Sequence, residues 1–467
     1  MDPEALPTLF DGLTAFLVPG IDDVARFEDP ARGARGRAAL VVAPANVEEV
    51  RNVVRRCVAN GVRLLPQGAN TGLVGASVAP PEIPTVVLTS ERLRSSVAID
   101  VGSSTATVSA GTRLSELNEA AAAYGLQLPV DLGADPAIGG MIATNTGGSR
   151  VLRYGPMRRY VLAAEVVAAD ADVDQGTGVL GPLRKDSRGL DATQLAVGSG
   201  GALGVITGAV VDLVALPHSS ATWWLAVDDA SRVLELFGVL DRRRPGALTA
   251  FELVSRAALE RTVIAAGGPP NPFGDEVPNV AVLAEWSFAG SGEGGNGVED
   301  DIAAAFDAGL LADGRLVEPS LAWALRHRVS ESLRTLGVVL GHDVSVPRSS
   351  LMDLRQRAID AVAALAPEAV MCDFGHAGDG GLHLNVLFPT DVGPPGDTLR
   401  AAIRGAIDDL VLAAGGSYSA EHGLGPLNAE RWLATTPLIE RRLVTALKDV
   451  VDPHRLLGHP AHPYNRL

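Results

Sequence analysis

Several residue types are scarce in this sequence of 467 residues, and each shortage narrows what the protein can be. Its two cysteines, Cys57 and Cys372, are too few for a disulfide framework or an iron–sulfur cluster. A net charge of −16 without a basic run argues against a nucleic-acid partner or an anionic membrane surface. No stretch reaches the roughly 18 uninterrupted apolar residues of a membrane span. The N-terminus lacks the charged-then-apolar build of a secretory signal, so we expect a cytoplasmic location.

Histidine and lysine are unevenly distributed along the chain. All nine histidines lie at position 218 or later, and lysine occurs only at positions 185 and 448. The first half is therefore glycine-rich and free of histidine, which suits a region that holds a cofactor. The second half carries the groups that titrate near neutrality. For a chain of this length we expect two or three domains.

Residues 38–66 predict a β-α-β unit. The apolar run 39–42 predicts a buried strand, Asn46 predicts a helix N-cap completed by Glu49, and 62–65 predicts the second strand. Cys57 keeps the helical spacing of the apolar residues, so we expect it to be a core residue. The second strand leads directly into the glycine-containing loop 66–73.

Further elements follow from local patterns. We expect short strands at 85–88, 97–100 and 105–109, a helix at 114–124, strands at 223–227 and 280–287, and helices at 230–240 and 299–308. Two more glycine-rich passages lie at 132–148 and 197–207. Beyond about Pro217 the sequence pattern changes to longer alternations of strand and helix, which predicts a domain boundary. The stretch 290–297 is better interpreted as a flexible surface connection than as a phosphate cradle.

The three glycine-rich loops suggest phosphate binding by backbone N–H groups, because only glycine allows such close approach. The nicotinamide dinucleotide fingerprint does not fit. Gly198-x-Gly200 lacks the third glycine and is followed by a strand-like run instead of a helix. Each loop alone could be a tight turn, but three in one histidine-free half favour a cofactor.

Imidazole and carboxylate groups are concentrated in the second half. His376 and His383 are followed further along by the adjacent pair Glu421 and His422. Neutral imidazole and carboxylate bind divalent first-row metals, so His376, His383 and Glu421 predict a metal site with positions open for substrate. His422 would be left to move protons. These residues alone also fit a metal-dependent hydrolase, since the same ligands can activate water.

Neighbouring residues refine this cluster. In an extended segment His383 and Asn385 point to one face, while Leu384 and Val386 point into the core. Asp379 is a further candidate ligand, although Asp followed by Gly is most often a turn former.

The loop 66–73, the passage 138–148 and the passage 198–207 together resemble the flavin-binding half of the vanillyl-alcohol-oxidase-like, or PCMH-type, flavoproteins. The segments 376–385 and 421–425 resemble the D-2-hydroxyacid dehydrogenase branch of that family, which includes D-2-hydroxyglutarate and D-lactate dehydrogenases. The five motifs occur in the right order. The resemblance implies an α+β fold, with a PCMH-type FAD-binding domain of two subdomains followed by a substrate (cap) domain whose antiparallel sheet is flanked by helices.

The resemblance also implies domain bounds. We expect an N-terminal extension at 1–34, the FAD-binding domain at 35–216, and the substrate- and metal-binding C-terminal oxidase domain at 217–467, with about the last 40 residues returning to the FAD domain. Some relatives attach flavin through a histidine in the pyrophosphate loop, but Asn70 stands near that position. FAD should therefore be noncovalent.

Site residues follow by position from the resemblance. The pyrophosphate loop is Pro66, Gln67, Gly68, Ala69, Asn70, Thr71, Gly72 and Leu73, and the segment along the flavin includes Gly139, Gly140, Ala143, Thr144, Asn145 and Gly148. Ile206 would meet the adenine side, and Gly133, Tyr154, Gly155 and Gly201 complete the cofactor-binding set.

The catalytic set is also implied by the resemblance. His376, His383 and Glu421 would bind the metal, most often zinc, and Asn385 would help to position the substrate. Zinc would lower the pKa of the substrate hydroxyl as a Lewis acid, and His422 would accept its proton as the C2 hydride moves to flavin N5. Arg326 would clamp the substrate carboxylate, with Ser330 one turn later on the same helix face.

This chain departs from the family pattern at several positions. Gly341 and Asn428 stand where the family usually has lysine, Gly381 stands for asparagine, Gly200 stands for glutamate, and the C-terminal asparagine-proline is blurred around Gly458-His459-Pro460. A second substrate carboxylate, as in 2-hydroxyglutarate, lacks a partner unless Arg348 or Arg328 supplies one.

The leading hypothesis is an FAD-dependent dehydrogenase that oxidises a small D-2-hydroxy acid. It would pass electrons to an unidentified acceptor such as an electron-transfer flavoprotein, a quinone or a dye-like molecule, and it could form a homodimer. One alternative is a flavoprotein with an altered substrate or lost turnover. The other is a metal-dependent hydrolase, which leaves the three glycine loops unexplained.

Overall fold

The computed structural model describes residues 6–12, 15–17, 20, 22–30, 33, 35–170, 183–265, 269–289 and 297–467. The predicted surface connection at 290–297 lies, except for Gly297, outside these residues. The chain divides into two compact units. The first comprises Met1–Gly148, Pro156–Leu216 and Glu421–Leu467, and the second comprises Ser149–Gly155 and Pro217–Ala420.

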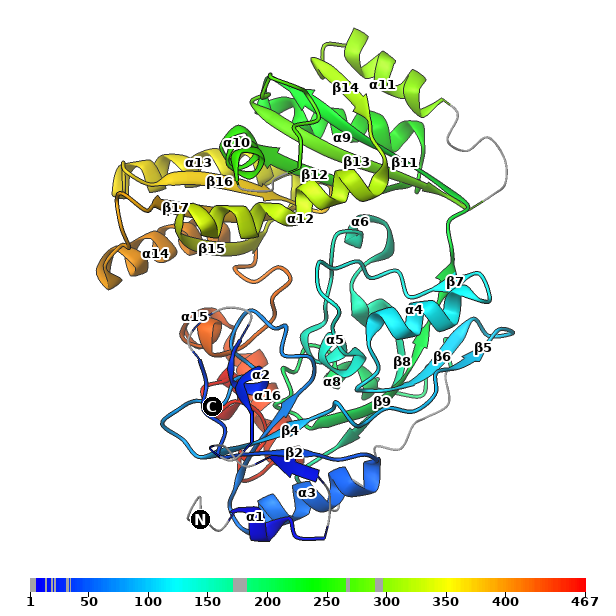
Figure 1. Cartoon of the computed structure of the whole chain (residues 1–467), viewed down its shortest axis with the longest axis vertical. Coiled ribbons are helices and arrows are strands. Elements are labelled where there is room, and N and C mark those ends of the chain that lie inside the picture. The colour runs from blue at the N-terminus through cyan, green and yellow to red at the C-terminus, as the bar shows by residue number, and fades with distance from the viewer. Residues whose placement is uncertain are drawn as a thin grey trace. The chain divides into compact units, whose positions relative to one another are not determined.

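The first unit is built on two four-stranded sheets (Figure 1). Its elements are α1 Leu6–Leu9, β1 Ala15–Leu17, α2 Ala25–Glu28, β2 Leu40–Ala43, α3 Val47–Ala59, β3 Arg63–Gln67, β4 Thr85–Thr89, β5 Ala98–Asp100, β6 Thr105–Ser109, α4 Leu114–Ala122, β7 Leu126–Gln127, α5 Ile138–Thr144, β8 Val161–Val167, α8 Thr193–Ala196, β9 Val205–Asp212, β10 Val214–Ala215, α15 Ala429–Thr435 and α16 Leu438–Val451. One sheet has the order β1-β2-β4-β3, in which β2, β4 and β3 are parallel. The other is antiparallel with the order β5-β6-β9-β8.

The predicted β-α-β unit is confirmed. The Asn46 side chain accepts the N–H of Glu49 at the start of α3, and the buried stripe of α3 includes Val50, Val54 and Cys57. Burial raises the pKa of the Cys57 thiol to about 12, so this cysteine serves as a packing residue.

The glycine-rich passage after residue 132 contains a helix that the sequence did not predict. Ile138–Thr144 forms α5, and one of its two glycines, Gly139, is a packing residue. A Cβ added at Gly139 would lie 2.7 Å from the Cβ of Ala110, and the Gly139 N–H donates to the Ala110 carbonyl at 2.9 Å. Glycine masks the helical pattern because it carries no side chain to reveal a period.

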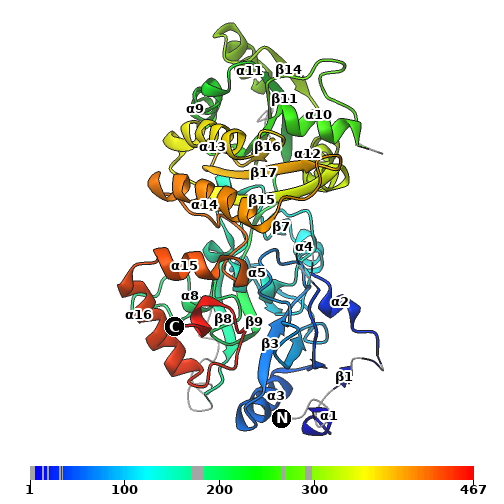
Figure 2. The same ribbon diagram turned by 90° about the vertical axis from the view of Figure 1, so that its left-hand side faces the viewer.

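The last 47 residues, Glu421–Leu467, belong to the first unit. Their helices are α15, orange-red in Figures 1 and 2, and α16, which is closer to red. Beyond α16 the chain runs beside β3, where the Leu64 N–H donates to Leu456 and the Gly458 N–H donates to Leu64, each at 2.9 Å. Strand β3 leads into the loop 66–73, so the C-terminal segment supports the strand that carries this loop.

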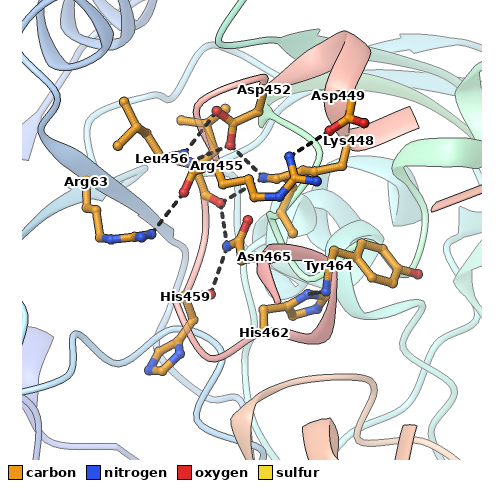
Figure 3. A network of polar contacts seen from close by, with 12 residues as sticks. Arg63, Lys448, Asp449, Asp452, Arg455, Leu456, His459, His462, Tyr464 and Asn465 are labelled. Atoms are coloured by element: carbon orange, nitrogen blue, oxygen red, sulfur yellow. Dashed lines mark hydrogen bonds and ion pairs between the residues drawn. The ribbon is translucent and has the colours of Figure 1, made fainter. Parts of the chain in front are cut away.

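A buried ion pair holds this C-terminal segment together (Figure 3). Lys448 and Asp452 are both fully buried, and their charged atoms are 2.6 Å apart. The Lys448 ammonium also donates to the carbonyls of Ala202, at 2.5 Å, and Leu457, at 3.2 Å. One side chain thus connects α16, the segment after it and the third glycine-rich loop.

The second unit contains one antiparallel seven-stranded sheet of order β14-β11-β13-β12-β16-β17-β15. Its elements are α6 Val151–Tyr154, β11 Ser219–Val227, α9 Val233–Arg243, β12 Leu248–Ser255, α10 Arg256–Ile264, β13 Val280–Phe288, α11 Val298–Asp307, β14 Asp313–Leu316, α12 Pro319–Leu336, β15 Gly337–Ser345, α13 Leu351–Leu365, β16 Val370–Gly375, β17 Gly381–Pro389 and α14 Asp397–Ala413. Helices α9, α11, α13 and α14 contribute to the hydrophobic core of one face, and α10 and α12 to that of the other. No described helix is both long enough and apolar enough to cross a membrane.

A short segment of the predicted FAD-binding domain packs with the second unit instead. Within Ser149–Gly155, the Arg150 guanidinium pairs with Glu285 at 2.8 Å, and Arg153 donates to the Ser287 carbonyl at 2.5 Å. Both partners lie on β13. These contacts are with residues far along the chain, so no local pattern could have revealed them.

Candidate flavin and metal sites

The structure brings the three glycine-rich loops together within the first unit. A Cβ at Gly68 would lie 3.7 Å from the Gly140 Cα, and one at Gly201 would lie 3.6 Å from Pro66. The N–H of Gly198 donates to Ile142 at 3.0 Å, and that of Gly200 donates to Ala143 at 2.8 Å. The loops therefore form one backbone-lined region.

Two amide side chains anchor the loop after β3 by hydrogen bonds. Buried Gln67 donates to the carbonyls of Phe27 and Ser77 at 2.9 and 2.7 Å. Asn70 has a φ of 55°, and its side chain donates to Asp29 and accepts from Ser77. The hydrogen bonds of the Asn70 amide therefore stabilise the conformation of the loop.

This region fits a flavin nucleotide. A Cβ at Gly140 would have no atom within 4 Å, so the backbone of α5 borders open space beside the loop 66–73. Asn145, in the left-handed region at φ 51°, ends α5 and accepts the N–H of Arg158. Bare backbone beside open space is what close approach of a phosphate or an aromatic ring requires.

Most predicted cofactor residues lie in the first unit, with some differences in setting. Gly133 is exposed before α5, Ile206 is buried on β9, and Tyr154 and Gly155 lie in the segment that packs with the second unit. The remaining residues lie as follows: Pro66, Gln67, Gly68, Ala69, Asn70, Thr71, Gly72 and Leu73 at and after the end of β3; Gly139, Gly140, Ala143, Thr144, Asn145 and Gly148 on or just after α5; and Gly201 in the third loop.

The structure gives a physical reason for glycine at position 200. Gly200 has a φ of 61°, and a Cβ there would lie 2.7 Å from Nε2 of His462. His462 is fully buried, and its Nδ1 accepts the N–H of Tyr464. The imidazole from the C-terminal segment thus occupies the space that a side chain at position 200 would need.

Replacing Gly200 with alanine is therefore expected to weaken FAD retention and lower the thermal midpoint. The left-handed backbone alone costs of order 1–3 kcal/mol for a residue with a Cβ, and the His462 contact adds to that cost. Gly61→Ala is the matched control, because Gly61 has a φ of 64° but nothing within 4 Å of its added Cβ. Equal losses in the two variants would mean that His462 does not crowd this position.

Stability is expected to fall as the pH is lowered from 6.5 towards 4, because two histidines are buried near the C-terminus. Burial, with Lys448 and His459 nearby, lowers the pKa of His462 to about 3, and burial near Arg63 lowers that of His459 to about 4. Unfolding raises both towards about 6.5, so the unfolded chain binds more protons in this window. At pH 5 each of the two histidines should lower the free energy of unfolding by about 2 kcal/mol relative to neutral pH.

Urea denaturation at pH 7 and pH 5 measures this effect. His462→Asn keeps an acceptor near Nδ1 but cannot titrate in this range, so it should reduce the pH dependence, whereas His454→Asn, at an exposed histidine, should not. An unfolding free energy that stays constant between the two pH values in the parent protein would contradict the prediction.

Two predicted metal ligands are neighbours in the second unit. His383 lies on β17 opposite Asp343 of β15 and Phe374 of β16, and His376 follows β16 directly. The two imidazole rings are edge to face with centroids 5.3 Å apart. Leu384 belongs to the core of the opposite face, so the predicted alternation along β17 is confirmed.

A buried carboxylate joins His376 to the predicted substrate arginine. Glu252 on β12 has a side chain only 1% exposed, lies 2.6 Å from Nδ1 of His376, and accepts from Nε of Arg326 at 2.6 Å. Burial raises the pKa of Glu252, but Arg326 and His376 outweigh that effect and lower it to about 2. Glu252 therefore already pairs with one edge of the Arg326 guanidinium.

Other predicted residues lie close by in register. Asn385 is paired with Gly341 across β15 and β17, on the side of the sheet that carries His383. Arg326 stacks over the Phe374 ring at 4.6 Å, and Phe374 also contacts His383. Asp379 accepts the Gly381 N–H at 3.1 Å, which confirms its expected role in a turn.

Glu421 and His422 begin the last segment of the first unit. The residues before them run beside β15, where Ser417 and Ser345 exchange two backbone hydrogen bonds and the Ala420 N–H donates to the Asp343 carbonyl at 3.3 Å. Asp343 is the register partner of His383. Glu421 is the next residue in the chain after Ala420. In the first unit Glu421 accepts the Gly148 N–H at 3.2 Å.

Comparison with known proteins identifies the family. Residues 38–174 match the FAD binding domain, and residues 216–459 match the C-terminal domain of FAD linked oxidases. The chain belongs to the FAD-linked oxidases. It is 33% identical to mitochondrial D-2-hydroxyglutarate dehydrogenase of Bos taurus, over 97% of this chain and 82% of that protein. It is also 33% identical to D-2-hydroxyglutarate dehydrogenase of Xanthomonas citri pv. viticola, over 90% of this chain and 88% of that protein.

Among solved structures, alkyldihydroxyacetonephosphate synthase matches 90% of this FAD-linked oxidase with a TM-score of 0.67, covering 76% of the synthase. Sequence identity is 19%, so this likeness shows the fold alone. The predicted fold class is confirmed as α+β with a PCMH-type FAD-binding domain, and FAD is confirmed as the cofactor type. The chain is an FAD-dependent oxidoreductase.

Two buried glutamates of this FAD-linked oxidase were missed from the sequence. Glu252 and Glu285 each stand inside an apolar strand, and Glu285 accepts from Arg150, Thr249 and Trp323. A lone carboxylate within a buried strand was the available signal, since such groups are rarely fully buried unless paired. Their partners could not be inferred, because they lie on other elements.

Proposed function

We propose that this FAD-linked oxidase is a D-2-hydroxyacid dehydrogenase, which oxidises the CH–OH group of a small D-2-hydroxy acid to a 2-oxo acid with the help of a divalent metal. The observation that carries the proposal is the pairing of His376 with His383 on the sheet face that also holds Arg326 and Asn385. Curated relatives named D-2-hydroxyglutarate dehydrogenase support this substrate class.

The residues fit a metal of the zinc type. Two imidazoles and a carboxylate form a common catalytic ligand set, and Nδ1 of His376 is engaged by Glu252, so His376 would bind a metal through Nε2. His376, His383 and Glu421 would hold the ion. Glu421 is included because it directly follows Ala420, whose N–H donates to the carbonyl of Asp343, the register partner of His383. A bound metal supplies Lewis acidity to the substrate hydroxyl and carboxylate oxygens.

The remaining residues orient the substrate and move its proton. Arg326, through the guanidinium hydrogens that Glu252 does not use, and Asn385 would bind the substrate carboxylate. His422 would accept the proton of the C2 hydroxyl at an imidazole nitrogen. Bound FAD supplies the hydride acceptor at N5. The flavin would be noncovalent, because Asn70 stands where some relatives carry the attaching histidine and its amide is already hydrogen-bonded.

A flavoprotein with an altered substrate or lost turnover is the second candidate. It is favoured by Gly341, which lies opposite Asn385 and brings no side chain to this face. A D-lactate-like acid with an uncharged end needs no cation there, whereas 2-hydroxyglutarate carries a second carboxylate. The proposal also includes an electron acceptor, which would be an electron-transfer flavoprotein, a quinone or a dye-like molecule. It further includes a homodimeric state.

Anaerobic titration of purified holoprotein tests the proposed function. D-lactate or D-2-hydroxyglutarate should bleach the flavin absorbance, and the L enantiomers should not. Metal removal with a chelator should abolish bleaching while the flavin stays bound, and added Zn²⁺ should restore it. A flavin that no D-2-hydroxy acid reduces would favour the second candidate, and bleaching that resists complete metal removal would exclude the metal role.

A further inference from the structure

Glu252 occupies an unusual place in the second unit. It lies on β12, near the centre of the seven-stranded sheet, and its side chain is only 1% exposed. One carboxylate oxygen is 2.6 Å from Nδ1 of His376, and the other accepts from Nε of Arg326, also at 2.6 Å. Burying a carboxylate costs several kcal/mol even when it is paired, so an apolar strand residue would be the simpler choice for stability alone.

We propose that Glu252 is a positioning residue that fixes His376 as the tautomer with hydrogen on Nδ1 and thereby presents Nε2 to the metal. The proposal rests on the proposed metal role of His376. A carboxylate between a guanidinium and an imidazole can only accept hydrogen bonds, so the hydrogen of a neutral His376 must lie on Nδ1. Such an outer carboxylate also orients the ring and strengthens the ligand nitrogen.

Arg326 has a defined part in this arrangement. Its guanidinium only donates, and it is buried with its side chain 7% exposed. It holds one carboxylate oxygen of Glu252, which leaves the other oxygen directed at His376. The residue predicted to bind the substrate carboxylate and a predicted metal ligand thus share one acceptor.

Two double variants test the acceptor apart from the ion pair. Both contain Arg326→Met, which removes the buried cation, so neither is left with an unpaired charge. Glu252→Gln with Arg326→Met retains an oxygen that can accept from Nδ1 of His376. Glu252→Leu with Arg326→Met has a side chain of similar size and no acceptor. The pair therefore differs in whether a hydrogen-bond acceptor for Nδ1 of His376 is present.

The readouts do not depend on turnover. In competition with a chromophoric chelator, the Gln double variant should bind Zn²⁺ within a few-fold of the parent protein, and the Leu double variant should bind it about 10–100-fold more weakly. Nitrogen-15 spectra of histidine-labelled, metal-free protein should show hydrogen on Nδ1 of His376 in the parent and the Gln double variant. The Leu double variant should show a mixture of tautomers.

Glu285→Gln is the matched control, because Glu285 is an equally buried glutamate of the same sheet that is hydrogen-bonded to Arg150, Thr249 and Trp323 and not to a histidine among the described residues. It should leave zinc affinity and the His376 tautomer unchanged. Equal zinc affinity and equal tautomers in the two double variants would overturn the role of Glu252. A parent protein that binds no metal would instead refute the proposed function, and the metal-free spectra would still decide whether Glu252 sets the tautomer.

Discussion

Replacing His422 with alanine is expected to slow reduction of the bound flavin by a D-2-hydroxy acid about 10²–10⁴-fold, the usual contribution of a positioned general base. The variant should still purify yellow and should retain its metal, because the proposed ligands are His376, His383 and Glu421. The expected loss is in the rate of reduction at saturating substrate, since alanine removes a proton acceptor and leaves Arg326 and Asn385 to bind the carboxylate.

Anaerobic stopped-flow measurement of flavin bleaching provides the rate, and absorbance and metal analysis confirm that both cofactors are present. His454→Ala is the control, because His454 is an exposed histidine of the C-terminal segment and lies outside every proposed site. Normal reduction by the His422 variant would show that another group accepts the proton. Loss of metal or flavin from it would mean that His422 holds a cofactor.

Replacing Lys448 with methionine should lower the free energy of unfolding by about 3–5 kcal/mol, the range measured when one partner of a buried ion pair is removed. Asp452 would remain fully buried, and among the described residues the N–H groups of Leu456 and Leu457 would still donate to its carboxylate. The Ala202 carbonyl, in the third glycine-rich loop, would lose its ammonium donor. We therefore expect weaker FAD retention together with the loss of stability.

Urea denaturation and the fraction of flavin that survives gel filtration measure the two effects. The double variant with Lys448→Met and Asp452→Asn removes the uncompensated charge, so it should recover a large part of the lost stability. Arg466→Met is a matched control, because it breaks the exposed pair with Glu430 in the same segment and should change stability by less than about 1 kcal/mol. A Lys448 variant as stable as the parent would contradict the expected cost.

Local chemistry was predictable from the sequence. The N-cap at Asn46 and the helix after it depend on residues within a few positions, and the structure confirms them. The alternation of His383 and Leu384 follows from the period of a strand, so it was predictable without knowledge of the partners of β17. The cluster of His376 and His383 was suggested by residue type and spacing, and the structure confirms that they are neighbours.

Contacts across the fold were not predictable. Nothing around Glu252 in the sequence indicates that Arg326 and His376 are its partners, because the strands and the helix that carry them are brought together only by the sheet. The helix α5 was missed because glycines erase the apolar pattern that would reveal it. The packing of Ser149–Gly155 with the second unit was not predictable either, because its partners lie on β13, far along the chain.

The chain passes between the two units four times, at 148/149, 155/156, 216/217 and 420/421. A premature stop just after Ala420 would therefore leave the second unit's segments whole, yet it would take Lys448, His462 and the strand-like partner of β3 away from the first. Such a late truncation would therefore destabilise the first unit, most of which is synthesised before the second. Completion of the nascent flavin-binding unit must wait until residues 421–467, which follow the whole second unit, have been synthesised.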